Sequence, residues 1–201
     1  MHALLVIAHP SSKGFVRVLA DAYKLKLEEA GHTVELLDLY KKESQEPYLS
    51  FEIPSETKAD PEHLTPMQEK INNAQHLAFF HPLWWGGMPA PLKNFVDRNF
   101  ASGFAFKYTK WGAQGLLKGK TGRVIVTGGG SPWKYLCIGM PFAVVWNLFI
   151  LFYCGVWPRM FEYIGPKFGR VPEEKLQKWI RRIEKKAENE AKYWIRKAQR
   201  N

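Results

Sequence analysis

Short apolar runs recur along the chain and alternate with longer segments that are apolar on one side only. A short apolar run bounded by turn residues is typical of a strand in a parallel sheet that is covered on both faces. Such segments are predicted to be strands at residues 2–8, 32–40, 76–81, 122–127 and 156–165. The intervening segments are predicted to be helices at residues 14–30, 66–75, 89–101, 136–153 and 173–200.

This alternation predicts a doubly wound α/β fold, with a parallel sheet and helices on both of its faces. The length is typical of a single domain, which we expect to span residues 1–201. The first helix is expected to end at Gly31 and to bury Val18, Leu19, Ala22, Tyr23, Leu27 and Ala30. The last helix is expected to bury Leu176, Trp179, Ile180, Ile183, Ala187, Ala191 and Trp194.

Three stretches do not fit this alternation. Residues 41–66 are polar, contain several prolines and lack clean periodicity, so we expect a long surface excursion there. Residues 102–119 are expected to be an aromatic, glycine-containing loop. The uncharged run 136–154 approaches the length of a membrane span, but it lies between two predicted strands of one sheet. We therefore expect a buried helix there, which a second subunit could cover.

The formal charge of +10 is concentrated near the C-terminus, where residues 173–201 hold ten Lys and Arg against five Glu. One solvated helix face explains most of this excess, so nucleic acid is not expected as a partner. The only two cysteines, Cys137 and Cys154, lie in or beside an apolar run. They argue against a disulfide scaffold or a metal site and fit a reducing, cytoplasmic compartment. The N-terminal MHALLVIAHP is too short for a signal peptide and is predicted to be a strand.

Residues 80–98, FHPLWWGGMPAPLKNFVDR, carry the most informative pattern. A buried strand stops at Pro82, two tryptophans and a Gly-Gly pair follow, and two prolines then begin a helix, where a missing N–H is tolerated. In an open α/β sheet such a loop lies at the carboxyl ends of the strands, where ligands bind. A flat apolar ledge beside free N–H donors suits a planar ring such as a flavin. The alternative is an ordinary turn with two core tryptophans.

Two other strand ends lead into loops that could contact the same ligand. Residues 9–15, HPSSKGF, offer hydroxyls, a glycine and a helix N-terminus, which together can hold a phosphate. Residues 127–131, TGGGS, offer N–H donors that could stabilise negative charge on a ligand edge. Neither a dinucleotide fingerprint nor a P-loop is present. Alternatively, His9 caps a strand end, Phe15 staples the following helix and the glycines form a flexible connector.

Across most of its length the chain resembles the NAD(P)H:quinone reductases of the flavodoxin-like fold. This group of flavoproteins includes DT-diaphorase and the ancillary reductases of bacterial potassium-efflux systems. The most specific matching piece is HPLWWGGMPAPLKNFVDRNF at 81–100. The others are AHP (8–10) with Phe15, DLY (38–40), GFAFKY (103–108), LLKGKTGRVIVTGGG (116–130) and FYCGVWP (152–158). The resemblance implies a flavodoxin-like doubly wound sheet and a homodimer with two flavin sites built across the subunit interface.

By motif position, the resemblance places His9 and Phe15 beside the flavin phosphate region. It implies that the isoalloxazine ring is flanked by residues of the aromatic loop, namely Pro82, Leu83, Trp84 and Trp85. The pyrimidine edge of the ring would lie against Thr127, Gly128 and Gly129. Phe106 and Tyr108 occupy the positions of substrate-pocket aromatics, although they could equally pack the interface.

Two positions depart from the pattern of the DT-diaphorase-like members. These members place a Tyr and then a His after the glycine-rich loop, where the two residues help to balance charge during hydride transfer. Here Tyr135 is displaced by one residue, and Pro141 stands where a His would be expected. Val16 follows Phe15 where the mammalian enzymes have Asn. Tyr135 is therefore the candidate catalytic residue, with a core aromatic as its alternative role.

These features predict an oxidoreductase in which NAD(P)H reduces a bound flavin, FAD or FMN, which then reduces a quinone or similar acceptor by two electrons. A second hypothesis is a flavin-binding ancillary subunit that docks on a membrane transporter through the basic C-terminal helix. A one-electron flavodoxin carrier is disfavoured, because such carriers have acidic surfaces and this chain is basic.

Overall fold

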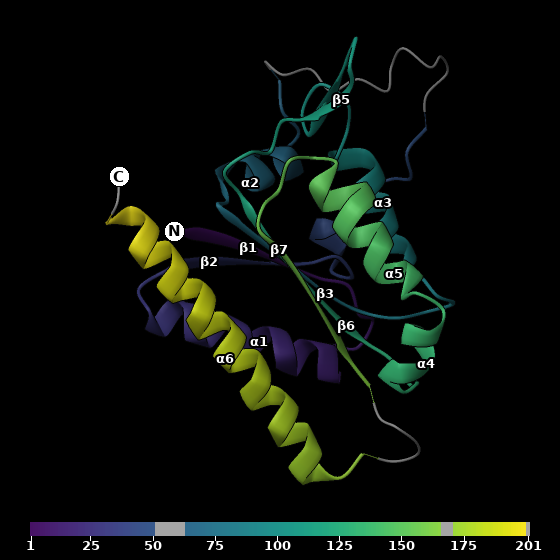
Figure 1. Cartoon of the computed structure of the whole chain (residues 1–201), viewed down its shortest axis with the longest axis vertical. Helices are drawn as coiled ribbons and strands as arrows, with labels where there is room; N and C mark the ends of the chain where they lie inside the picture. The colour runs from purple at the N-terminus through teal and green to yellow at the C-terminus, as the bar shows by residue number, and fades with distance from the viewer. Residues whose placement is uncertain (51–62, 166–170, 200–201) are drawn as a thin grey trace.

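A computed structural model describes residues 1–50, 63–165 and 171–199 (Figure 1). Five strands form a parallel sheet, as the sequence pattern predicts, and their order in the sheet is β2-β1-β3-β6-β7. The strands are β1 (His2–Ile7), β2 (Thr33–Asp38), β3 (His76–Pro82), β6 (Thr121–Thr127) and β7 (Arg159–Ile164). After β2 the chain crosses back past β1 to form β3, so that β1 and β3 are neighbours in the sheet. The segments that follow these two strands lead to opposite faces of the sheet.

Helices cover both faces of this sheet (Figure 1). One face is covered by α1 (Phe15–Glu29) and α6 (Glu173–Ala198). The other face is covered by α2 (Pro66–Asn73), α3 (Ala90–Asn99), α5 (Pro141–Val144) and the π-helical segment η3 (Val145–Phe152). The remaining helical segments are η1 (Lys42–Ser44) and α4 (Pro132–Cys137).

The two-sided burial of the central strands explains their continuous apolar runs. In β1, Leu4 and Val6 belong to the core under α2, α3 and η3, whereas Leu5 and Ile7 belong to the core under α1 and α6. All four side chains are almost completely buried. Each such side chain contributes about 1.5–3 kcal/mol through burial, so the sheet holds its carboxyl edge firmly in place.

Some sequence expectations need correction. Residues 102–119, expected to be a loop, contain an antiparallel hairpin of β4 (Phe106–Thr109) and β5 (Gly112–Gly115). The sequence pattern did not predict this hairpin, because its strands are short and largely exposed. The expected helix 136–153 is divided, because Gly139 and Met140 adopt positive φ before Pro141 begins α5.

On α1, Val18 faces solvent, and Val16 and Ala20 are buried instead. Within the described segments no helix is both long and apolar enough to cross a bilayer. Residues 51–62 of the expected surface excursion at 41–66 lie outside the described residues, and so does residue 200, the predicted end of the last helix.

A buried polar cluster ties α1 and α6 to the amino ends of β3 and β6. His76 is hydrogen-bonded to the Tyr23 hydroxyl at 2.8 Å and to the Thr121 hydroxyl at 2.7 Å. Nearby, Arg123 forms a buried ion pair with Glu190 of α6. Burial lowers the pKa of His76 to about 3, helped by the charge of Arg123, so the ring stays neutral. This cluster lies at the opposite edge of the sheet from the candidate site.

Candidate functional site

Three loops meet at the carboxyl edge of the sheet, where β1, β3 and β6 end side by side. They are residues 8–15 after β1, 82–89 after β3 and 127–131 after β6. The Leu83 N–H donates to the Thr127 carbonyl at 2.7 Å, which joins the second loop to the third. The His9 and Trp84 rings lie 6.4 Å apart, which places the first loop beside the second. The structure thus brings together the loops that the sequence singled out.

The aromatic loop closes as a tight turn. Trp84 and Gly87 exchange backbone hydrogen bonds of 3.1 and 2.9 Å, and the two residues between them, Trp85 and Gly86, have φ values of 50° and 76°. Positive φ is ordinary for Gly86 but costs Trp85 about 1 kcal/mol. The Trp85 side chain is nevertheless fully exposed, and Trp84 is 43% exposed. An exposed, strained aromatic residue adds little to the stability of this chain, which favours a role in binding.

Pro82 and Leu83 connect the turn to the core of the protein. Pro82 is the buried last residue of β3, and Leu83 is half-buried and packs against the core under α2 and α3. The side chain of Pro82 therefore presents little surface to a ligand. Of the four residues expected to flank a flavin ring, the two tryptophans are the ones with exposed rings.

Behind this loop lies a buried hydrogen-bonded pair that sequence reasoning missed. The Trp146 indole N–H donates to His81 Nε2 at 3.0 Å, and His81 Nδ1 donates to the Pro82 carbonyl at 2.8 Å. Because the indole can only donate, the His81 ring is neutral with its proton on Nδ1. Burial lowers the pKa of His81 to about 4. The pair fixes the end of β3, but nothing local in the sequence links residues 81 and 146.

The glycine loop is shaped by two tyrosines. The buried Tyr163 hydroxyl donates to the Gly130 carbonyl at 2.8 Å, and a Cβ on Gly128 would lie 2.3 Å from that hydroxyl oxygen. Burial and the neighbouring Tyr135 phenol raise the pKa of Tyr163, so it remains a donor. The Tyr135 ring lies 5.2 Å from that of Tyr163 and is half-buried beside Gly130. A Cβ on Gly129, in contrast, would meet no heavy atom within 4 Å.

The first loop leads into the N-terminus of α1. His9 Nδ1 accepts a hydrogen bond from the Ser11 N–H at 3.0 Å, so the His9 ring is held by its own loop. Gly14 is the N-cap of α1 and makes no side-chain cap, which leaves the first helical N–H groups available to an anion. The Phe15 ring packs against Trp179 of α6, with 5.9 Å between the ring centroids, so this ring contacts the C-terminal helix.

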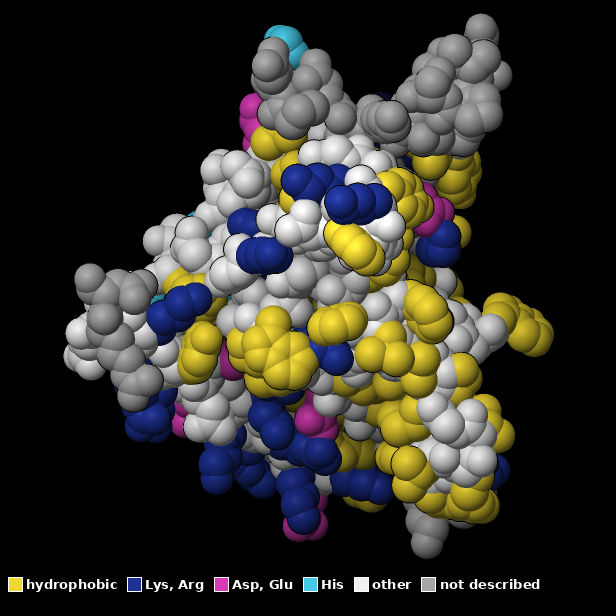
Figure 2. Space-filling view, turned by 45° about the horizontal axis from the view of Figure 1, so that its top comes forward, with side chains coloured by type: hydrophobic (Ala, Val, Ile, Leu, Met, Phe, Trp, Pro, Cys, Tyr) yellow, Lys and Arg dark blue, Asp and Glu magenta, His cyan; other side chains and the backbone are white. Residues whose placement is uncertain are grey.

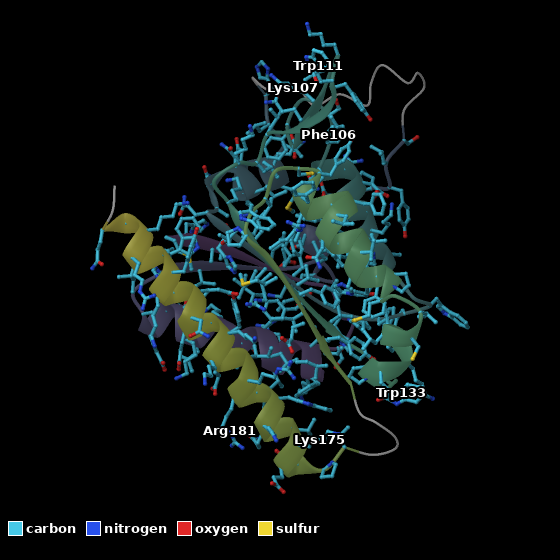
Figure 3. The ribbon with its side chains drawn as sticks, in the orientation of Figure 1. Phe106, Lys107, Trp111, Trp133, Lys175 and Arg181 are labelled. Carbon is cyan, nitrogen blue, oxygen red and sulfur yellow. The ribbon has the colours of Figure 1, made fainter. Side chains whose placement is uncertain are left out.

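The structure does not bring Phe106 and Tyr108 to these loops. Both lie on the β4–β5 hairpin, where the Phe106 ring packs against Tyr108 at 5.5 Å and against Tyr153 at 4.9 Å. Figure 3 shows Phe106 at the opposite end of the molecule from Trp133, which follows the glycine loop. Within one chain the two aromatics cannot line the site.

Comparisons with known proteins agree with the fold. A family model described as a flavodoxin-like fold matches residues 1–187. The chain belongs to this family. An uncharacterized NAD(P)H oxidoreductase of Haemophilus influenzae is 32% identical over 82% of this chain and 84% of its own length. The solved NAD(P)H:quinone oxidoreductase of Methanothermobacter marburgensis is 28% identical, has a TM-score of 0.79 and covers 94% of this chain and 98% of its own. An FMN-dependent NADH:quinone oxidoreductase of Caldicellulosiruptor bescii is 37% identical over 46% of this chain and 49% of its own length.

Within this flavodoxin-like family the ligand site lies at such a carboxyl edge, and the residues present here fit a flavin nucleotide. The three loops contain no Asp or Glu, whereas Lys13 and the α1 N-terminus add positive potential for a phosphate. A Cβ at Gly129 would meet no other part of this chain, so its packing does not require a glycine there. The space beside Gly129 is therefore open for the edge of a ligand. Trp84 supplies an exposed ring for stacking.

Proposed function

We propose that this chain is a flavin-dependent NAD(P)H:quinone oxidoreductase. The observation that carries the proposal is the convergence of a strained aromatic turn, an open glycine loop and a helix N-terminus at one edge of the sheet. These three parts match the ring face, the ring edge and the phosphate of a flavin nucleotide. The relatives named above as NAD(P)H or NADH oxidoreductases support the same reaction class.

When bound, the flavin supplies the hydride chemistry, and the chain supplies binding and orientation. The N–H groups at Gly129 and Gly130 would donate to the ring edge that becomes negative on reduction. The tryptophans would limit access of water to one ring face and leave the other for a planar donor or acceptor. His9, Phe15 and Thr127 would position the phosphate end and the adjoining edge.

Tyr135 is the candidate catalytic residue of this site. Its half-buried phenol lies beside Gly130, at the edge of the glycine loop. From there the hydroxyl could donate a hydrogen bond toward developing negative charge. The His that DT-diaphorase-like members place after their Tyr has no counterpart here, so this phenol and the backbone donors would act without it.

We assign FMN as the flavin because a relative named as FMN-dependent aligns with nearly half of the chain. FAD was an equal expectation from the sequence. Mass spectrometry of the cofactor released by heating distinguishes FMN from FAD directly.

We propose that two copies of the chain form a homodimer through an apolar face on α5 and η3. This dimer face consists of Val144, Val145, Leu148, Phe149 and Phe152, each of which is 38% to 67% exposed. Figure 2 shows exposed hydrophobic side chains gathered on the right of the molecule, the side on which Figure 1 shows α5. Such a large contiguous apolar surface is rare on a monomer. A dimer would also give the β4–β5 hairpin a role, because Phe106 and Tyr108 of one copy could enter the site of the other copy.

The absorption spectrum of gently purified protein is the first test, followed by NAD(P)H oxidation with a soluble benzoquinone. We expect flavin bands and quinone-dependent NAD(P)H oxidation, both reduced by Trp84→Ala. Colourless protein that takes up neither FMN nor FAD would overturn the assignment. The compared relatives are named as oxidoreductases. Docking of the basic helix to a membrane protein stays a prediction.

A further inference from the structure

The N-terminal half of α6 carries a basic stripe that the proposed reaction does not use. Its members are Lys175, Lys178, Arg181, Arg182, Lys185 and Lys186. The opposite side of the helix is buried through Ile183, Ala187 and Ala191. Figure 3 shows Lys175 and Arg181 at the lower end of α6.

Two carboxylates of α6 lie away from the stripe. Glu184 and Glu188 lie toward α1, where the pKa of Lys26 is raised by its hydrogen bond with Glu29 and by these two carboxylates. On the opposite flank, Arg182 pairs with the buried Glu162 of β7, and the Lys186 ammonium lies 3.9 Å from the same carboxylate.

The other four cations of the stripe form no ion pair with a carboxylate in the described part of the chain. They are Lys175, Lys178, Arg181 and Lys185. Glu174 lines the same surface, so the stripe sets six cations beside one carboxylate and carries a local excess of positive charge.

Exposed apolar side chains lie at the same end of the molecule as this stripe. On and just after α4, Trp133 is 52% exposed, Leu136 is 68% exposed and Ile138 is 65% exposed. Figure 3 places Trp133 at the same end of the molecule as Lys175, and in Figure 2 hydrophobic and basic side chains meet at the lower edge. This end also adjoins the candidate site, since α4 directly follows the glycine loop.

We propose that this end of the molecule, the basic stripe of α6 with the apolar side chains of α4, binds the surface of an anionic phospholipid bilayer. Basic side chains bind such a surface electrostatically, and exposed Trp and aliphatic side chains enter the headgroup region. A nucleic acid would use the stripe but leave the apolar part without a role. The inference deepens the proposed function, because a surface contact would bring the site close to quinones dissolved in the bilayer.

Vesicle sedimentation tests the proposal with two matched triple variants. One is Lys175→Glu/Lys178→Glu/Arg181→Glu. The other, Lys41→Glu/Lys42→Glu/Lys118→Glu, makes the same change in net charge at exposed lysines elsewhere. The probes are vesicles of phosphatidylcholine alone and vesicles in which about one third is phosphatidylglycerol, at an ionic strength of about 0.1 M.

We expect the protein to bind only the anionic vesicles and to lose this binding at high salt. The stripe variant should bind about 100-fold more weakly, and the control variant within about threefold of the original chain. Trp133→Ala should weaken vesicle binding and leave any binding to double-stranded DNA unchanged. All three variants should keep the reductase rate with a soluble quinone.

Three results would overturn the proposal: no binding to anionic vesicles, equal losses in both triple variants, or vesicle binding that is indifferent to Trp133→Ala. The last result, together with tight DNA binding through the stripe, would assign the surface to nucleic acid. Absence of flavin and of reductase activity would refute the proposed function alone, because vesicle binding is measured independently of both.

Discussion

The two glycines Gly128 and Gly129 are neighbours in sequence, but the structure predicts opposite consequences for a methyl group at each. On Gly128 the added Cβ would lie 2.3 Å from the Tyr163 hydroxyl oxygen, and on Gly129 it would meet nothing within 4 Å. Neither residue has a positive φ, so alanine can adopt both backbone conformations. The pair therefore separates a packing requirement from a ligand requirement within one loop.

For Gly129→Ala we expect the flavin-free protein to be as stable as the original, or more stable by about 0.4–1 kcal/mol through loss of unfolded-state entropy. Flavin affinity should fall, because the methyl group prevents close approach to the backbone donors. Loss of one such hydrogen bond costs about 1–3 kcal/mol, which corresponds to about a tenfold to hundredfold rise in Kd.

For Gly128→Ala we expect the main effect on the stability of the flavin-free protein. Tyr163 must shift, and its 2.8 Å bond to the Gly130 carbonyl weakens. We therefore expect the flavin-free protein to lose about 1–3 kcal/mol of stability. Urea unfolding of the flavin-free proteins and fluorescence titration with FMN measure the two quantities separately. If Gly129→Ala binds FMN as tightly as the original chain, the glycine loop does not contact the flavin and the proposed site is wrong.

Three further predictions follow from the same structure. Tyr135→Phe should slow flavin reduction in stopped-flow by about tenfold or more while changing the flavin Kd by less than about threefold; equal reduction rates would remove Tyr135 from the mechanism. Phe149→Glu, at the most exposed residue of the dimer face, should yield monomers in sedimentation with reduced quinone turnover, and an unchanged mass would refute that interface. His81, with its pKa lowered to about 4, and His76, with its pKa lowered to about 3, both take up protons more readily in the unfolded chain. The free energy of unfolding should therefore be at its full value above about pH 6.5 and should fall by about 2 kcal/mol per histidine by about pH 5. His81→Gln should remove about half of this pH dependence. A free energy of unfolding that does not change with pH in the original chain would contradict the prediction.

Residue patterns along the chain were sufficient to predict the sheet, its parallel pairing and the loops at its carboxyl edge. This succeeds because a strand buried on both faces, such as β1 or β3, must be apolar at nearly every position, and that requirement is visible locally. The turn chemistry at Trp84–Gly87 is equally local. The β4–β5 hairpin was missed for the complementary reason, since its exposed strands have no buried face to mark them.

Contacts between distant segments were decided by the tertiary structure alone. The amino-acid sequence does not reveal that Trp146 would donate to His81, that Tyr163 would shape the glycine loop, or that Glu190 would be buried against Arg123. Nor does it show that Phe106 lies at the opposite end of the molecule from Trp133, which follows the glycine loop of the chain's own site. Periodicity states whether a side chain is buried, whereas the partner of a buried polar group depends on which elements the fold places side by side.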